Sequence, residues 1–94
     1  MKNNNNFIDL AALSPVHSPI IYFGLYLQQM RINAELTQSQ LAKRAFCSPT
    51  WISKLEKGTR KPNYFILKTY IAPVLAEFNS AADVQILLWL AQCN

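Results

Sequence analysis

The sequence has little of the material from which metal sites and enzyme active sites are built. Its 94 residues include two cysteines, one histidine and five acidic residues. Cys47 and Cys93 form no CxxC pair, and His17 is the single imidazole. A zinc site needs about four nitrogen or sulfur ligands, and the carboxylates that acid–base catalysis uses are not clustered here. We therefore expect no metal, no cofactor and no enzymatic activity.

Long apolar stretches are missing too. No apolar run approaches the roughly 18 residues that cross a bilayer, and Met1-Lys2 is followed by four asparagines instead of the apolar core of a signal peptide. Hydrophobic residues make up 51% of the chain and charged residues 15%, which is typical of a globular protein and not of a disordered one. We expect a cytoplasmic protein of one compact domain, without a membrane partner.

Glycine occurs twice, no segment alternates as a strand would, and apolar residues recur at helical spacing. Phe23, Leu27, Met30 and Ala34 form one such stripe. Helix starts and stops are signalled by caps at Ser18, Thr37, Ser48 and Ser80, and by Gly58 as a C-terminal stop. A further helix starts at Pro62-Asn63, and Pro73 is expected to end or kink it. The pattern predicts an all-α fold.

The chain divides into three expected parts. Residues 1–18 form a flexible N-terminal segment, residues 19–72 the main domain, and residues 73–94 a helical extension. Asn3–Asn6 is interpreted as a mobile tail, with an arm on DNA as the alternative. Phe7–Leu13 is apolar enough to pack as a helical turn or two, and His17 is interpreted as a loop residue.

The positive charge is concentrated in one stretch. The chain carries a net charge of +4. Residues 43–61 hold six Lys and Arg against Glu56 alone, whereas residues 1–42 are neutral and residues 62–94 carry a net charge of −1. Such a stretch indicates either a solvated surface or a contact with an acidic partner.

A motif overlaps this basic stretch and extends beyond both of its ends. In order, it contains Leu36-Thr37-Gln38, Leu41-Ala42, Ser48, Ile52-Ser53, Leu55-Glu56, Gly58 and Pro62. Residues 20–72 thereby resemble the Cro/C1-type, or XRE, family of helix-turn-helix proteins. The resemblance implies a five-helix bundle of the lambda-repressor-like type that binds double-stranded DNA. Two short capped helices joined by about four residues agree with it, because the second helix of such a pair enters the major groove by its N-terminal end.

By this resemblance the recognition helix runs from Ser48 to Lys57. Its expected base-reading residues are Ser48, Pro49, Thr50, Trp51 and Lys54. Hydrogen-bonding groups are sparse among them, so apolar and shape readout should be proportionally larger. We expect Trp51 to be exposed, with burial in the core as the alternative.

Phosphate contacts are expected from the flanks of the motif. The candidates are Gln38, Lys43, Arg44, Lys57, Arg60 and Lys61, of which Gln38 matches a family position that binds phosphate. If roughly four to six of them neutralise phosphates, the logarithm of the binding constant should fall with the logarithm of the salt concentration with a slope of about −4 to −5 per protomer.

Four other positions in the matching residues carry expectations. Arg31 and Glu56 match a family pair that forms a structural salt bridge. The family usually has glycine in the turn between the two helices, where φ is positive, and this chain has Phe46. Either the turn takes another geometry or Phe46 adopts a strained backbone in order to pack against a neighbour. Cys47, next to the recognition helix, is interpreted as an ordinary thiol, with a redox switch as the alternative.

The last expected helix, to about Gln92, has two apolar stripes. One consists of Val84, Leu87, Leu88 and Ala91. The second consists of Ile86, Trp89, Leu90 and Cys93, and because a small protomer has one core, we expect this second stripe to form a homodimer interface. The alternative is that both stripes are buried within one protomer.

Three functions remain open at this point. The first is a transcriptional repressor or autoregulator that binds a palindromic operator as a homodimer. The second is an antitoxin that binds both a cognate toxin and its own promoter. A small enzyme or ligand sensor is the third, and it is disfavoured because catalytic residues are not clustered.

Overall fold

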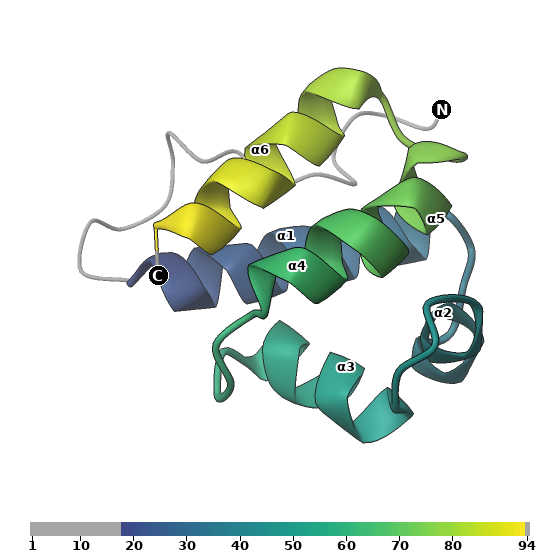
Figure 1. Ribbon diagram of the computed structural model, residues 1–94, viewed down its shortest axis with the longest axis horizontal. Helices are drawn as coiled ribbons and strands as arrows, with labels where there is room; N and C mark the ends of the chain where they lie inside the picture. The colour runs from purple at the N-terminus through teal and green to yellow at the C-terminus, as the bar shows by residue number, and fades with distance from the viewer. Residues whose placement is uncertain (1–17, 94) are drawn as a thin grey trace.

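Residues 18–93 are described by the computed structural model, and all regular structure within this range is helical. The elements are α1 (Pro19–Asn33), α2 (Gln38–Arg44), α3 (Pro49–Lys57), α4 (Tyr64–Ile66), the π-helical segment η3 (Leu67–Ile71), α5 (Ala72–Ala76) and α6 (Ala81–Gln92). Because α4, η3 and α5 follow one another without a break, the described part forms five helical rods (Figure 1). The predicted all-α class is confirmed. The expectations for Asn3–Asn6, Phe7–Leu13 and His17 lie outside the described residues.

The helix ends follow the capping signals in the sequence, with one exception. At Thr37 the side-chain hydroxyl accepts from the Gln40 N–H at 3.0 Å, and the Gln40 side chain accepts from the Thr37 N–H at 2.8 Å, so the capping box is complete. Ser48 and Ser80 also cap their helices through the side chain. Ser18 does not, because its side chain makes no capping hydrogen bond.

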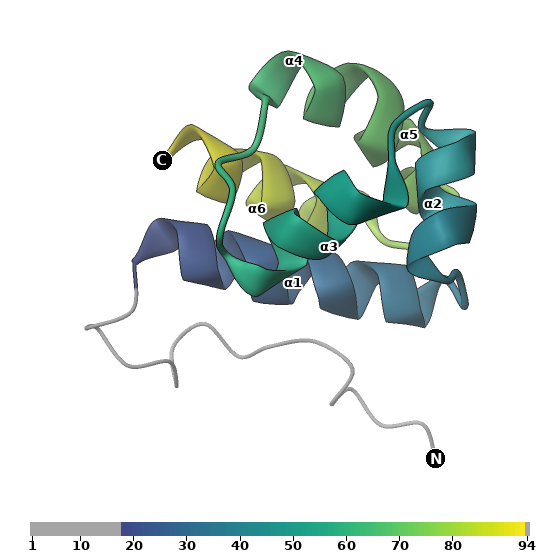
Figure 2. The same cartoon turned by 90° about the horizontal axis from the view of Figure 1, so that it is seen from below.

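The core is formed by residues of all five helical rods. Figures 1 and 2 together show α3 and α6 on opposite sides of the molecule, with α1 behind them and the α4–α5 rod in front. Phe23, Leu27 and Met30 of α1 are fully buried, as their spacing predicts. They meet side chains from the other rods: Leu41, Ile52, Leu55, Leu67, Ile71, Leu75, Leu87 and Leu90.

A glycine brings α1 and α3 unusually close together. A Cβ atom at Gly24 would lie 2.4 Å from the Leu55 carbonyl oxygen and 2.6 Å from that of Glu56. Both neighbouring atoms are backbone, so the clash could not be relieved by turning a side chain. The absence of a side chain at Gly24 therefore sets the separation between α1 and the C-terminal half of α3.

The helix that contains Pro73 does not end there but continues to Ala76. A proline inside an α-helix lacks an N–H and crowds the carbonyl four residues earlier. Here the preceding turn, Leu67–Ile71, is π-helical, and the Ala72 N–H donates to the Leu67 carbonyl five residues back. This wider turn accommodates Pro73, so of the two expected outcomes, an end or a kink, the end of the helix is not found.

Helix α6 buries one of its two apolar stripes fully. Val84, Leu87, Leu88 and Ala91 are buried, as expected. The second stripe is split, because Leu90 is only 2% exposed whereas Trp89 is 58% exposed. The expectation that Leu90 faces another chain is therefore wrong: it packs in the protomer's own core. Ile86 is half-buried and Cys93 is exposed.

A hydrogen bond joins the start of α6 to α1. The Tyr26 hydroxyl donates to Asp83 Oδ1 at 2.9 Å, and Asp83 Oδ2 accepts from the Ser80 hydroxyl at 3.0 Å. Burial, and then the hydrogen bond and negative charge of Asp83, raise the pKa of Tyr26 well above its ordinary value. Tyr26 thus links α1 to the start of α6.

Candidate nucleic-acid interface

Helices α2 and α3 are joined by a tight turn that ends α2 in a Schellman motif. The Cys47 N–H donates to the Ala42 carbonyl at 2.9 Å, and the Phe46 N–H donates to the Lys43 carbonyl at 3.4 Å. This pattern requires a left-handed backbone at the residue that follows the C-cap Ala45. That residue is Phe46, and its φ is 58°. The same pair of bonds ends α3, with Gly58 at φ 75°. Of the two expectations for Phe46, the strained backbone is the one found.

The Phe46 side chain is 83% exposed, so burial of the ring does not compensate the strain of its backbone. Its ring lies edge-on to Tyr70 with centroids 5.8 Å apart, and Tyr70 in turn lies edge-on to Phe65 at 6.4 Å. Phe65 is also exposed. A hollow of about 430 Å³ lies beside this aromatic cluster, lined by Phe46, Ile66 and Tyr70.

The N-terminal half of α3 presents its side chains to solvent. Ser48, Pro49, Thr50 and Lys54 are exposed. Ser48 Oγ accepts a hydrogen bond from the Trp51 backbone N–H at 3.0 Å. The Ser48 side chain therefore caps α3. Trp51 is half-buried and packs against the core. It is therefore neither an exposed residue, as expected, nor a fully buried one.

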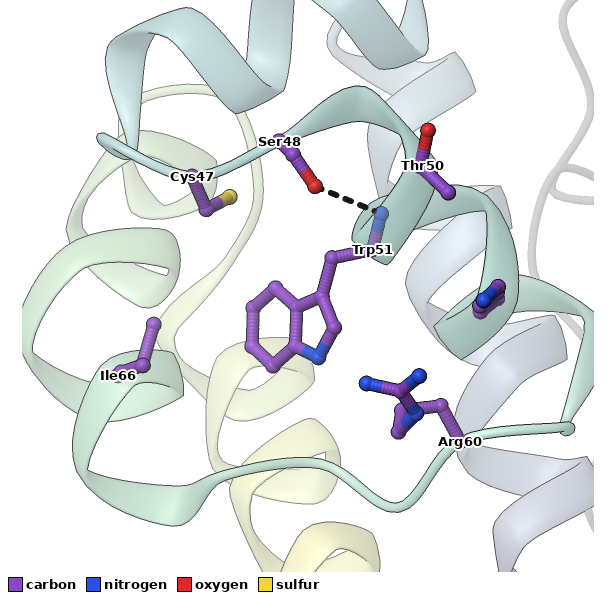
Figure 3. A pocket seen from close by; sticks show the side chains of 7 residues that line it. Cys47, Ser48, Thr50, Trp51, Arg60 and Ile66 are labelled. Atoms are coloured by element: carbon purple, nitrogen blue, oxygen red, sulfur yellow. Dashed lines mark hydrogen bonds between the residues drawn. The ribbon is translucent and has the colours of Figure 1, made fainter.

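Most of the predicted base-reading residues surround one hollow of about 420 Å³. We call it the recognition hollow, and it is lined by Cys47, Ser48, Thr50, Trp51, Lys54, Arg60 and Ile66. Figure 3 shows the Trp51 indole between Ile66 on one side and the Arg60 guanidinium on the other. Pro49 is exposed but does not line it. Arg60, expected to contact phosphate, lines this hollow as well, and Ile66 is a lining residue that the sequence did not indicate.

The predicted phosphate-binding residues differ in whether their side chains are already bound to other groups of the protein. Lys43, Lys57, Arg60 and Lys61 are exposed. Arg44 is held by Glu77: its Nη2 atom donates to both carboxylate oxygens, at 2.7 and 2.8 Å, and its guanidinium lies 6.0 Å from the Phe78 ring centroid. An exposed pair of this kind contributes about 0–1 kcal/mol. A phosphate could therefore displace Glu77, but Arg44 is not a free cation in this structure.

Gln38 belongs to a hydrogen-bond network inside the protein. Arg31 Nε lies 2.6 Å from Glu56 Oε2 and Arg31 Nη2 lies 3.0 Å from Glu56 Oε1, which confirms the expected salt bridge. The Gln38 amide donates to the same Oε1 atom at 3.0 Å. The network joins α1, the start of α2 and α3, so Gln38 has a structural contact in addition to the phosphate role expected for it.

No group of three or more His, Cys, Asp or Glu side chains that could hold a metal ion occurs within residues 18–93. Burial raises the pKa of the Cys47 thiol, which favours the unreactive protonated form over a redox-active thiolate. In the same part of the chain, none of the helices has the length and apolar character needed to cross a membrane.

The comparison with protein families agrees with this geometry. A family described as a helix-turn-helix domain matches residues 23–71, which is more than half of the chain and includes α2, the turn and α3. Comparisons with curated proteins and with solved structures return no match.

Proposed function

Because the chain belongs to the helix-turn-helix domain family, whose members are DNA-binding regulators, we propose that it is a sequence-specific repressor of transcription that binds its own promoter. The observation that carries the proposal is the recognition hollow, where the exposed start of α3 meets Lys54 and Arg60. Base edges would be read there and phosphates bound around it. In this mechanism repression results from occupation of the operator.

The proposed roles divide the interface into two sets. Thr50, Lys54 and Trp51 contact base edges, with Ser48 and Pro49 beside them. Exposed cations on the flanks bind phosphate: Lys43, Lys57, Arg60 and Lys61, joined by Arg44 when it leaves Glu77. Phosphate contacts position the protein without reading sequence, whereas base contacts specify the site. The two sets therefore predict different effects of mutation.

We further propose that two copies pair through α6 and bind a palindromic operator. Trp89 and Cys93 are exposed on α6 and Ile86 is half-buried, so a partly apolar strip is left after Leu90 is placed in the core. A typical interface buries about 800 Å² per partner, so neighbouring elements must contribute as well. A two-fold dimer would place its recognition helices about 34 Å apart.

Selection of bound duplexes from random DNA tests the proposal directly. We expect enrichment of an inverted repeat whose half-sites are about one helical turn apart. A non-palindromic enriched site would contradict the dimer, and no enrichment over the starting pool would contradict sequence-specific binding.

Variants then separate the two sets of residues. Thr50→Ala and Lys54→Ala should reduce the preference for the selected site over random DNA by about 1–3 kcal/mol if each removes a base contact. Arg60→Ala and Lys61→Ala should weaken binding to all sequences and each reduce the salt slope by about one. Equal losses on selected and random DNA for Thr50→Ala and Lys54→Ala would refute their base-reading role.

The dimer has its own test. Trp89→Asp places a charge in the proposed interface and should yield monomers in analytical ultracentrifugation, with weaker operator binding. Because Trp89 is 58% exposed, the variant should still fold, as circular dichroism can verify. Phe78→Asp, at another exposed aromatic residue outside α6, is the control and should leave the dimer intact. An unchanged sedimentation coefficient for Trp89→Asp would refute the interface.

The second candidate function is that of an antitoxin. It is favoured by the same exposed Trp89, which could bind a different protein instead of a second copy. Co-expression with the product of the neighbouring gene, followed by purification, distinguishes the two. A stable complex that Trp89→Asp disrupts would favour the antitoxin, whereas a homodimer without a second protein would favour the repressor.

A further inference from the structure

We propose that the recognition hollow accepts the C5-methyl group of a thymine, with Trp51 as the residue that reads it. The inference rests on the proposed DNA binding and specifies which base feature the site prefers. It makes Trp51 and Ile66 determinants of sequence specificity, although neither offers the hydrogen-bond array by which bases are usually distinguished.

The hollow has an apolar wall and a polar rim. Cys47, Trp51 and Ile66 are half-buried, and both Cys47 and Trp51 pack against the core. Thr50, Lys54 and Arg60 are exposed at its edge. Figure 3 shows the face of the indole turned to the hollow between Ile66 and Arg60. The backbone of Trp51 is held by the capping bond from its main-chain N–H to Ser48 Oγ, and its indole packs against the core, so the apolar wall exists before DNA binds.

The start of α3 is poor in groups that read bases by hydrogen bonding. Proline offers no donor, and the Ser48 hydroxyl accepts from the Trp51 backbone N–H, which leaves its O–H as a single donor. Thr50 and Lys54 are the remaining exposed polar side chains of α3 that line the hollow. A preference for sequence must therefore draw on apolar contact as well.

The major groove offers one apolar group on its base edges, the C5-methyl of thymine. An apolar wall beside the recognition helix complements that group and no other exposed feature of unmodified DNA. The cations on the rim suit the phosphates that flank it. Burial of one methyl group changes an equilibrium constant by about threefold to fivefold.

Replacement of thymine by deoxyuridine removes this methyl group and leaves the Watson–Crick edge intact. Each thymine of the selected operator is replaced in turn, and the dissociation constant is measured at fixed salt. For the wild-type protein we expect one or two positions in each half-site to lose about threefold to fivefold in affinity, and the other positions to be unaffected.

The same DNA series is then measured on variants of the wall. Trp51→Ala and Ile66→Ala should each bind the thymine and deoxyuridine operators equally well at the sensitive position. Two variants are used because Trp51 packs against the core, and urea unfolding establishes that each is folded. Phe65→Ala, which removes an exposed ring next to Ile66 but outside the hollow, should retain the full difference.

Each outcome bears on one hypothesis. Sequence-specific binding without sensitivity to deoxyuridine overturns the methyl contact and leaves the proposed function standing, whereas absence of any selected site overturns the proposed function itself. If Thr50→Ser abolishes the sensitivity and Trp51→Ala and Ile66→Ala do not, the methyl group is read by Thr50 and the hollow is not its site.

Discussion

Arg44 at the end of α2 donates from one nitrogen, Nη2, to both carboxylate oxygens of Glu77, which follows α5. The two residues are 33 positions apart in the chain. The pair places a negative charge beside a cation of the proposed DNA-binding surface. An acidic residue in this position lowers the contribution that Arg44 can make to phosphate binding, because the phosphate must compete with Glu77.

Neutralisation of Glu77 should therefore strengthen DNA binding. We expect Glu77→Gln to steepen the log–log salt slope by about one per protomer, because Arg44 becomes free to neutralise a phosphate. Fluorescence anisotropy over a salt series measures it. Glu35→Gln makes the same change in net charge at a residue without a described ion pair. If the salt slope steepened equally in both variants, the effect would be one of net charge, and Arg44 would not belong to the interface.

The network around Glu56 should matter far more for stability than the Arg44–Glu77 pair. The Glu56 side chain is 2% exposed and that of Arg31 12%, so Glu56→Gln leaves a largely buried guanidinium without its carboxylate. Loss of one partner of a buried pair costs about 3–5 kcal/mol, whereas Glu77→Gln should cost at most about 1 kcal/mol. Urea unfolding compares them, and similar values for the two variants would refute the importance assigned to burial.

The left-handed backbone at Phe46 predicts that glycine is preferred there. A residue with a Cβ atom pays roughly 1–2 kcal/mol in this conformation. Phe46→Gly and Phe46→Ala both remove the ring and its contact with Tyr70, so their difference isolates the backbone. We expect the glycine variant to unfold at higher urea, with an advantage of about 1 kcal/mol. An alanine variant of equal stability would show that the turn carries no strain.

Tyr26 should make the protein sensitive to alkali. Its pKa is raised in the folded state by burial and by Asp83, so above the ordinary tyrosine pKa of about 10 the unfolded chain loses the proton first. The free energy of unfolding therefore falls as the pH rises, by up to about 1.4 kcal/mol per pH unit.

Chemical unfolding between about pH 8 and pH 11 measures this loss. Tyr26→Phe has no proton to lose and should show a shallower decline than the wild-type protein. Tyr70→Phe, which changes a more exposed tyrosine, should show the same steep decline with pH as the wild-type protein. Parallel curves for Tyr26→Phe and the wild-type protein would rule out Tyr26 as the source.

The sequence predicted features that depend on neighbouring residues and was weaker on features set by distant contacts. The caps at Thr37 and Ser48 and the stop at Gly58 are local, and all three are confirmed. The Arg31–Glu56 bridge followed from the family resemblance, which carries long-range information. The burial of Leu90 was predicted only as the alternative, because it depends on how α6 lies over the rest of the core.

The recognition hollow shows the same division. Thr50, Trp51 and Lys54 were predicted from their positions in the motif, and the structure places them around one space. Ile66 comes from a different helix and has no sequence signal that links it to α3. Glu77 and its competition for Arg44 were missed for the same reason, since nothing in a charge count assigns a partner 33 positions away.

The close approach at Gly24 has a consequence for how this protein could change its DNA site. A side chain at this position must push the Leu55 and Glu56 carbonyls away from α1, and α3 moves with them. We expect such a substitution to tilt α3 and to shift all of the proposed base contacts together, although Gly24 itself lies on a different helix. A mutation far from the groove could therefore alter which operator is bound, and a screen for altered specificity should include this buried glycine as well as the exposed face of α3.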